Sequence, residues 1–101
     1  MQEQQLIPVR ELCLHHNVEV TFIQSLEAYG LIELTTIEEH SFLPSSQLTE
    51  FEKMIRLHHD LDINLEGIDV IHHLLKKLEN AQEEICRLKT KLKFYGEWNK
   101  A

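Results

Sequence analysis

The chain has 101 residues and a mass of 11.9 kDa, which is enough for one compact domain. Apolar residues make up 43% and charged residues 27%, as in globular proteins, and three Gly with two Pro favour long helices over an all-β fold. No run approaches the roughly 18 apolar residues of a membrane span, and the polar N-terminus is unlike a signal peptide. Cys13 and Cys86 are too few and too far apart for a disulfide framework. We therefore expect a cytoplasmic protein, not a secreted or membrane one.

The formal net charge of −7 is distributed unevenly along the chain. Residues 1–47 contain one basic residue, Arg10, against seven acidic ones. Residues 48–84 contain four basic and nine acidic groups, whereas residues 85–101 contain five basic groups and one acidic group. Nucleic-acid binding draws its affinity from Lys and Arg side chains that neutralise phosphates. The first half of the chain is therefore predicted to bind something other than nucleic acid.

Two short helices are predicted near the N-terminus. The first begins at Pro8, which suits a first helical turn, and ends near Asn17, which can adopt the left-handed conformation. The second ends at Gly30. Two short helices joined by a tight turn predict a helix-turn-helix. The apolar residues at helical spacing are Val9, Leu12 and Cys13 in the first helix, and Phe22, Ile23 and Leu26 in the second.

The stretch from Leu31 to Leu43 has the alternating pattern of β-strands. Ile32, Leu34 and Thr36 alternate with polar residues, and residues 40–43 can form a returning strand. We predict a two-stranded wing here, with Glu38 near its turn.

A third helix is predicted after Pro44, running to about Leu61, with Ser45 or Ser46 as its N-cap. Residues 60–64 then form a short corner, and Asn64 is the predicted N-cap of the last helix. The inner face of the third helix is predicted to carry Leu48, Phe51, Ile55 and His58.

The last helix, predicted from Leu65 to Tyr95, has the strongest periodicity in the sequence. Its apolar residues follow a 3-4 spacing that fits the a and d positions of a heptad repeat. The first half of the chain is too small to cover such a long apolar seam, so we expect a homodimer, in parallel or antiparallel orientation. The alternative is that the helix folds back on its own domain. The seam residues are Ile71, Leu74, Leu78, Ala81, Ile85, Leu88, Leu92 and Tyr95.

This order of elements resembles the MerR-like winged helix-turn-helix proteins over essentially the whole chain. Residues 26–32 (LEAYGLI) resemble the family's segment that ends the second helix and leads into the wing. Residues 62–68 (DINLEGI) resemble its corner before the following helix. The resemblance implies a mostly α fold with a winged helix-turn-helix lobe and third helix over residues 1–62. A C-terminal dimerisation helix is then expected over residues 63–101, within a single domain overall.

The departures from the DNA-binding members are informative. Those members place a phosphate-holding Arg before the Glu of the second helix, where this chain has Gln24, Ser25 and Leu26 before Glu27. Their wing carries an Arg near an aromatic residue, whereas here the wing reads IEEHSF over residues 37–42. Because phosphate contacts fix a protein on the duplex, their loss removes base reading as well.

The chain further resembles the CbpM-type chaperone modulators, a branch of this family. Residues 11–15 (ELCLH) and 56–61 (RLHHDL) are similar to theirs. The resemblance implies binding to the J-domain of a DnaJ/CbpA-type co-chaperone, inhibition of its co-chaperone activity, no catalysis and no cofactor. The alternative functions are a MerR-like transcriptional regulator that binds DNA as a dimer, and an adaptor for an unrelated protein.

A J-domain recruits its Hsp70 partner through a basic helical surface, so a competitor for that surface should be acidic. Complementary charge speeds encounter, while central apolar contacts supply most of the affinity. Each acid could equally be an ordinary solvated side chain. The acids proposed for partner binding are Glu38, Glu39, Asp60, Asp62, Glu66 and Asp69.

Metal binding and catalysis find little support in the sequence. Three His pairs begin at His15, His58 and His72, but adjacent helical residues point about 100° apart and cannot chelate one ion by themselves. Cys13 is expected to face inwards and Cys86 outwards, and no thiol stands where MerR-like metal sensors place theirs. No phosphate-binding loop, nucleophile elbow or triad is present. We therefore predict neither a metal site nor an enzyme.

Overall fold

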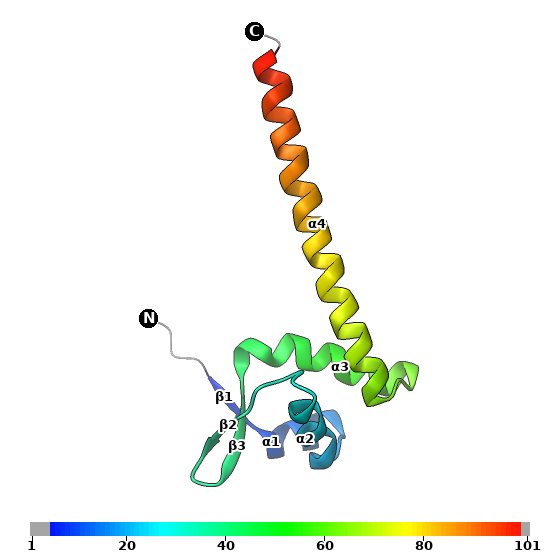
Figure 1. Cartoon of the computed structure of the whole chain (residues 1–101). Helices are drawn as coiled ribbons and strands as arrows, with labels where there is room; N and C mark the ends of the chain where they lie inside the picture. Colours follow the sequence, from blue (N-terminus) through cyan, green and yellow to red (C-terminus); the bar gives the residue numbers. More distant parts are fainter. Residues whose placement is uncertain (1–4, 100–101) are drawn as a thin grey trace. The chain divides into compact units, whose positions relative to one another are not determined.

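The computed structural model describes residues 5–99, which form four α-helices, a short 3-10 helix and a three-stranded sheet (Figure 1). The mostly helical winged helix-turn-helix fold with a long C-terminal helix is confirmed. The chain divides into two compact units, one ending at Asp69 and the other beginning at Val70. The division falls inside the last helix, whereas the predicted boundary lay between residues 62 and 63.

The helix-turn-helix consists of α1 (Val9–His16) and α2 (Val20–Ala28). Asn17 ends α1 in the left-handed conformation, with φ 53°, and the Val18 amide donates to the Cys13 carbonyl over 3.1 Å. Gly30 follows α2 with φ 76°, a backbone conformation that favours glycine. Both predicted helix ends are therefore confirmed, and the first helix starts one residue after Pro8.

The wing is formed by β2 (Thr35–Ile37) and β3 (His40–Pro44), which pair in antiparallel fashion. The sheet also has a third strand, β1 (Leu6–Pro8), which pairs with the other edge of β3. We did not predict β1, and the two-stranded description of the sheet was therefore incomplete. A three-residue segment is too short to show alternation, and its extended conformation is stabilised by pairing with residues far along the chain.

The strand-like pattern at residues 31–34 was a wrong prediction, because these residues form no strand. Leu31 and Ile32 are buried in the core instead. The Gln47 side chain takes the place of a strand partner for Glu33. Its Oε1 accepts a bond from the Glu33 amide at 2.7 Å, and its Nε2 donates to the Glu33 carbonyl at 3.1 Å. The backbone is thereby satisfied without a sheet.

The third helix begins later than predicted. Ser45–Gln47 form a 3-10 turn, and α3 runs from Leu48 to Leu61. The prediction that Ser45 or Ser46 caps this helix was wrong: Gln47 precedes α3, and no side-chain capping bond forms. The Gln47 amide is engaged with Glu33 instead. The inner face of α3 is buried at Phe51, Met54 and Ile55, and half-buried at Leu48 and His58.

The core of the first unit is entirely apolar in the part of the chain that the structure describes. It unites the helix-turn-helix, the loop after it, the wing, α3 and the start of α4. The buried residues are Val9, Leu12, Ile23, Leu26, Leu31, Ile32, Leu43, Phe51, Met54, Ile55 and Ile68.

The last helix, α4 (Leu65–Asn99), has 35 residues and is about 52 Å long at 1.5 Å per residue. Its predicted N-cap is confirmed: Asn64 Oδ1 accepts a bond from the Gly67 amide at 2.9 Å. A Cβ at Gly67 would lie 2.6 Å from Ile63 Cγ2 and 3.2 Å from Asn64 Oδ1. Glycine therefore keeps space for the capping side chain.

We expect Asn64→Ala to lower the free energy of unfolding by about 1 kcal/mol, because the Gly67 amide loses its acceptor. Urea denaturation followed by far-ultraviolet circular dichroism measures this change. Asn64→Asp is the matched control, because it retains an acceptor oxygen and should unfold close to the wild type. Equal stability of the Ala and Asp variants would contradict a stabilising role for the cap.

Candidate functional site

The second helix of a DNA-binding helix-turn-helix lies in the major groove and reads bases with its N-terminal residues. In this chain α2 contains neither Lys nor Arg. Its first residue, Val20, is 48% exposed, and the exposed Gln24 and Glu27 follow on the helix. The exposed surface of α2 therefore carries apolar and neutral polar side chains and one acid, Glu27, and it offers no cation for a phosphate.

The turn of the wing is acidic as well. Glu38 and Glu39 connect β2 to β3 and are both exposed. Their φ angles are 49° and 67°, so both carboxylate-bearing residues have the left-handed backbone of a type I′ hairpin turn. That conformation costs free energy in residues other than Gly and is more commonly provided by Asn-Gly. The turn therefore places two adjacent negative charges at the tip of the wing.

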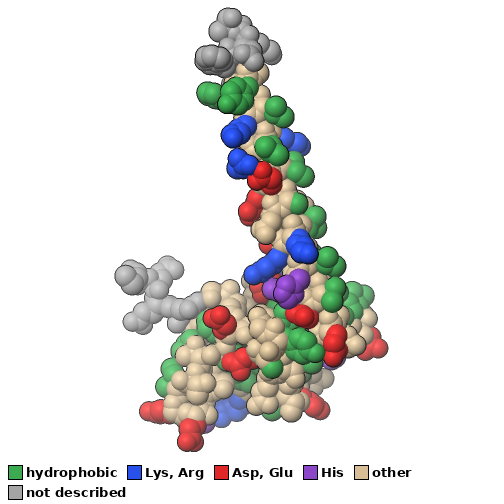
Figure 2. Space-filling model, viewed as in Figure 1, with side chains coloured by type: hydrophobic (Ala, Val, Ile, Leu, Met, Phe, Trp, Pro, Cys, Tyr) green, Lys and Arg blue, Asp and Glu red, His purple; other side chains and the backbone are tan. Residues whose placement is uncertain are grey.

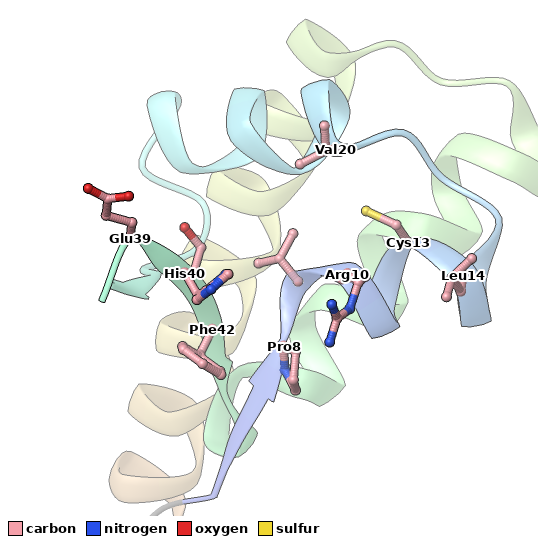
Figure 3. Close-up of a pocket in the computed structure, with 10 residues that line it drawn as sticks. Pro8, Arg10, Cys13, Leu14, Val20, Glu39, His40 and Phe42 are labelled. Carbon is pink, nitrogen blue, oxygen red and sulfur yellow. The ribbon is translucent and has the colours of Figure 1, made fainter. Parts of the chain in front are cut away.

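A groove lies between the helix-turn-helix and the wing, with a volume of 760 Å³. We call it the wing groove. Figure 3 shows Glu39, His40 and Phe42 along one side and Cys13 and Leu14 along the other, with Val20 and Pro8 at the two ends between them. The complete lining is Pro8, Val9, Arg10, Cys13, Leu14, Val20, Glu39, His40, Ser41 and Phe42.

Two apolar side chains of the wing groove are unusually exposed. Leu14 is 79% exposed and Val20 is 48% exposed, although Val9 beside them is buried in the core. The helical spacing in the sequence identified the core face of α1 but gave no role to Leu14. The signal in the sequence that could have identified Leu14 was an apolar residue outside the core face of the helix. This signal is weak because single exposed Leu residues are common.

The six acids predicted to bind a partner fall in two separate groups. Glu38 and Glu39 lie at the tip of the wing, whereas the other four lie around the corner between α3 and α4 (Figure 1). Within the first unit, the acids of each group therefore lie near one another, but the wing acids and the corner acids do not form one surface. The acids at the corner are Asp60, Asp62, Glu66 and Asp69.

The corner acids have structural contacts of their own. Asp62 ends α3 in the left-handed conformation, with φ 53°. Glu66 Oε1 accepts a hydrogen bond of 3.1 Å from the Tyr29 hydroxyl, which connects the end of α2 to the start of α4. This bond raises the pKa of Tyr29, and slight burial and the charges of Glu66 and Asp69 raise it further. At least one corner acid, Glu66, therefore has a structural role in connecting α2 to α4.

The predicted seam of α4 is exposed along its length within the single chain. Figure 2 shows apolar side chains along one side of this helix. Leu74, Leu78, Ile85, Leu88, Leu92 and Tyr95 are each between 45% and 71% exposed, Ala81 is exposed, and Ile71 is half-buried. An apolar face of this extent is typical of a surface that contacts another protein.

The histidine pairs have packing contacts. His58 stacks on Phe22 with ring centroids 4.4 Å apart, and its Nδ1 lies 3.0 Å from the Ile63 carbonyl oxygen. His16 makes an edge contact with Phe51 at 5.4 Å. Among residues 5–99, no group of three or more His, Cys, Asp or Glu side chains is arranged to hold a metal ion.

The two cysteines have different surroundings, as expected from the sequence. Cys86 is exposed, whereas Cys13 is half-buried in the wing groove. Burial raises the pKa of the Cys13 thiol above its ordinary value, against a smaller opposing effect of a backbone hydrogen bond. Cys13 is therefore a neutral thiol near pH 7 and a poor nucleophile.

We expect iodoacetamide at pH 7.5 to alkylate Cys86 faster than Cys13, because the raised pKa and partial burial leave less accessible thiolate at Cys13. Peptide mass spectrometry over a time course measures both rates in one sample. In urea the two rates should become similar. Faster modification of Cys13 than of Cys86 in the native protein would contradict the half-buried position of the Cys13 side chain.

Comparisons with known proteins agree with this geometry. The model of the MerR HTH family of regulatory proteins matches residues 7–90, a range that includes the helix-turn-helix, the wing, α3, all of β1 except Leu6, and most of α4. No curated protein and no solved structure matches the chain. None of the described helices is both long and apolar enough to cross a membrane. Because the family model covers well over half of the sequence, the chain belongs to the MerR HTH family of regulatory proteins.

Proposed function

We propose that this protein is a non-enzymatic modulator that binds the J-domain of a DnaJ/CbpA-type co-chaperone and inhibits its co-chaperone activity. One observation carries the proposal: the helix and wing that would contact DNA have acids and apolar side chains where phosphate-binding cations are needed. The resemblance of residues 11–15 and 56–61 to the CbpM-type modulators supports the same partner. The site of action would then be the cytoplasm.

The proposed mechanism is competition. The basic helical surface with which a J-domain recruits Hsp70 would be covered by this acidic lobe, so that Hsp70 cannot bind it. Opposite charges accelerate the encounter and set the register, and apolar contacts at the centre supply most of the binding free energy. This mechanism needs no cofactor and no bond-making step.

We also propose that the protein is a homodimer formed through α4. The seam carries large apolar side chains at heptad spacing, and the first unit has its own core without them. A second copy of α4 supplies a face of the same length and periodicity. Removing these side chains from water would stabilise the pair.

DNA binding as a dimer is the second candidate, and the family's description as helix-turn-helix regulatory proteins favours it. Among the described residues the basic side chains are Arg10 on α1, Lys53 and Arg56 on α3, and Lys76, Lys77, Arg87, Lys89, Lys91 and Lys93 on α4. A DNA complex would therefore have to use cations that lie outside α2 and the wing.

For the dimer, we expect Leu88→Asp to give a monomer, because the substitution places a charge in the centre of the apolar seam. Light scattering coupled to size-exclusion chromatography measures the mass. Thr90→Asp is the matched control: it introduces the same charge two residues away, outside the heptad a and d positions, and should remain dimeric. An unchanged mass for Leu88→Asp would contradict the proposed dimer.

For the partner, we expect calorimetric titration with the isolated J-domain of the host's DnaJ/CbpA-type co-chaperone to show micromolar or tighter binding. A DNA fragment at the same salt concentration should give no heat. Glu38→Lys with Glu39→Lys should weaken J-domain binding and flatten its salt dependence, because an attraction at the wing tip becomes a repulsion.

The two candidate functions give opposite results in this experiment. Binding to DNA with none to the J-domain would replace the modulator function with the regulator function. Full affinity of the doubly charge-reversed variant for the J-domain would move the charged contact from the wing to the corner acids.

A further inference from the structure

The wing groove has exposed apolar side chains that packing of the core does not explain. Leu14 and Val20 expose apolar surface at its edge, although Leu12 and Ile23 on the same two helices are buried. The core of the first unit is complete without Leu14 and Val20. Exposed apolar groups that converge on one groove are typical of a surface that binds a partner.

Acidic residues outnumber basic ones around this groove. Glu39 lies in its lining, Glu38 precedes it at the wing tip, and Glu19 precedes Val20 at the start of α2. Arg10, the one basic residue in the first 47 positions, also lies in the lining, so these three acids exceed the basic charge by two. A partner that matches the groove must therefore have an apolar centre with flanking positive charge.

We propose that the wing groove is where the partner's basic helix docks, with an apolar side chain of that helix between Leu14, Val20 and Phe42 and its Lys or Arg side chains beside Glu38 and Glu39. This inference rests on the proposed function and deepens it, because it assigns the J-domain contact to the wing face and not to the acidic corner. An amphipathic helix that presents an apolar stripe to a groove is a common mode of recognition between proteins.

The shape of the groove favours a helix over a small molecule. Small-molecule sites enclose most of the ligand surface in a concavity. Leu14 is 79% exposed, so its side chain stands at the edge of the groove and presents most of its apolar surface outwards. Such an edge contacts a broad partner more extensively than it contacts a compact ligand.

The decisive test is calorimetric titration of the full-length chain carrying Leu14→Gln and Val20→Thr with the isolated J-domain. Both substitutions keep the net charge, and Leu and Gln have similar helix propensities. Because the two side chains are exposed, the fold should be retained, which circular dichroism checks. The matched control is Leu61→Gln with Val70→Thr, which changes two exposed residues of the same types outside the groove.

We expect the groove variant to bind the J-domain at least about tenfold more weakly than the wild type, as for the loss of central apolar contacts, while the control stays within about twofold. Cys13 gives an independent readout, since it lines the groove. Bound J-domain should slow alkylation of Cys13 and leave the rate at Cys86 unchanged.

The outcomes separate this inference from the proposed function. If the wild type binds and both double variants bind equally well, the wing groove is not the docking site, and the modulator function stands. If the control variant is the one that loses affinity, the contact lies at the corner, and the groove assignment is overturned. If the wild type does not bind the J-domain at all, the proposed function fails, and the groove loses its assigned occupant with it.

Discussion

The structure of the first unit depends on the burial of a small apolar core to which α1, α2, the loop after α2, β3, α3 and the start of α4 all contribute. Ile23 and Leu26 of α2, Phe51 of α3 and Ile68 of α4 are almost completely shielded from water. Burial of such side chains stabilises a fold by roughly 1.5–3 kcal/mol each. Because Ile68 belongs to this cluster, the beginning of α4 is fixed to the lobe, and the Asn64 cap and the Tyr29–Glu66 bond reinforce the same place.

No charged residue of the described chain is fully buried, so nearly all of the charge lies at the surface. The helix-turn-helix presents no cation on α2 and two acids at the tip of the wing. Electrostatic attraction to phosphates is the largest general contribution to DNA affinity, and this surface lacks it. The same scaffold that positions a helix and a wing for a duplex can equally position them around a basic helix of a protein.

The second unit, which begins at Val70, differs in its energetics. The side chains of its seam are exposed, so packing within the single chain does not stabilise them. A long helix gains most of its stability from packing of its apolar face. A second copy of the helix would provide that packing, and two lobes would then be available to bind partners.

The sequence by itself determined the features that depend on neighbours a few residues apart. The left-handed turns at Asn17 and Gly30, the cap at Asn64 and the heptad spacing of α4 are of this kind, because backbone preference and helical periodicity act locally. The acidity of the wing was also visible in the sequence.

Only the tertiary structure decided what depends on contacts between distant segments. It paired β1 with β3, satisfied Glu33 with the Gln47 side chain, and separated the six acids into two groups. It also formed the wing groove, which places the exposed Leu14 across from the wing. Local spacing indicates which side of a helix is apolar, but it does not specify which distant segment will pack beside that helix.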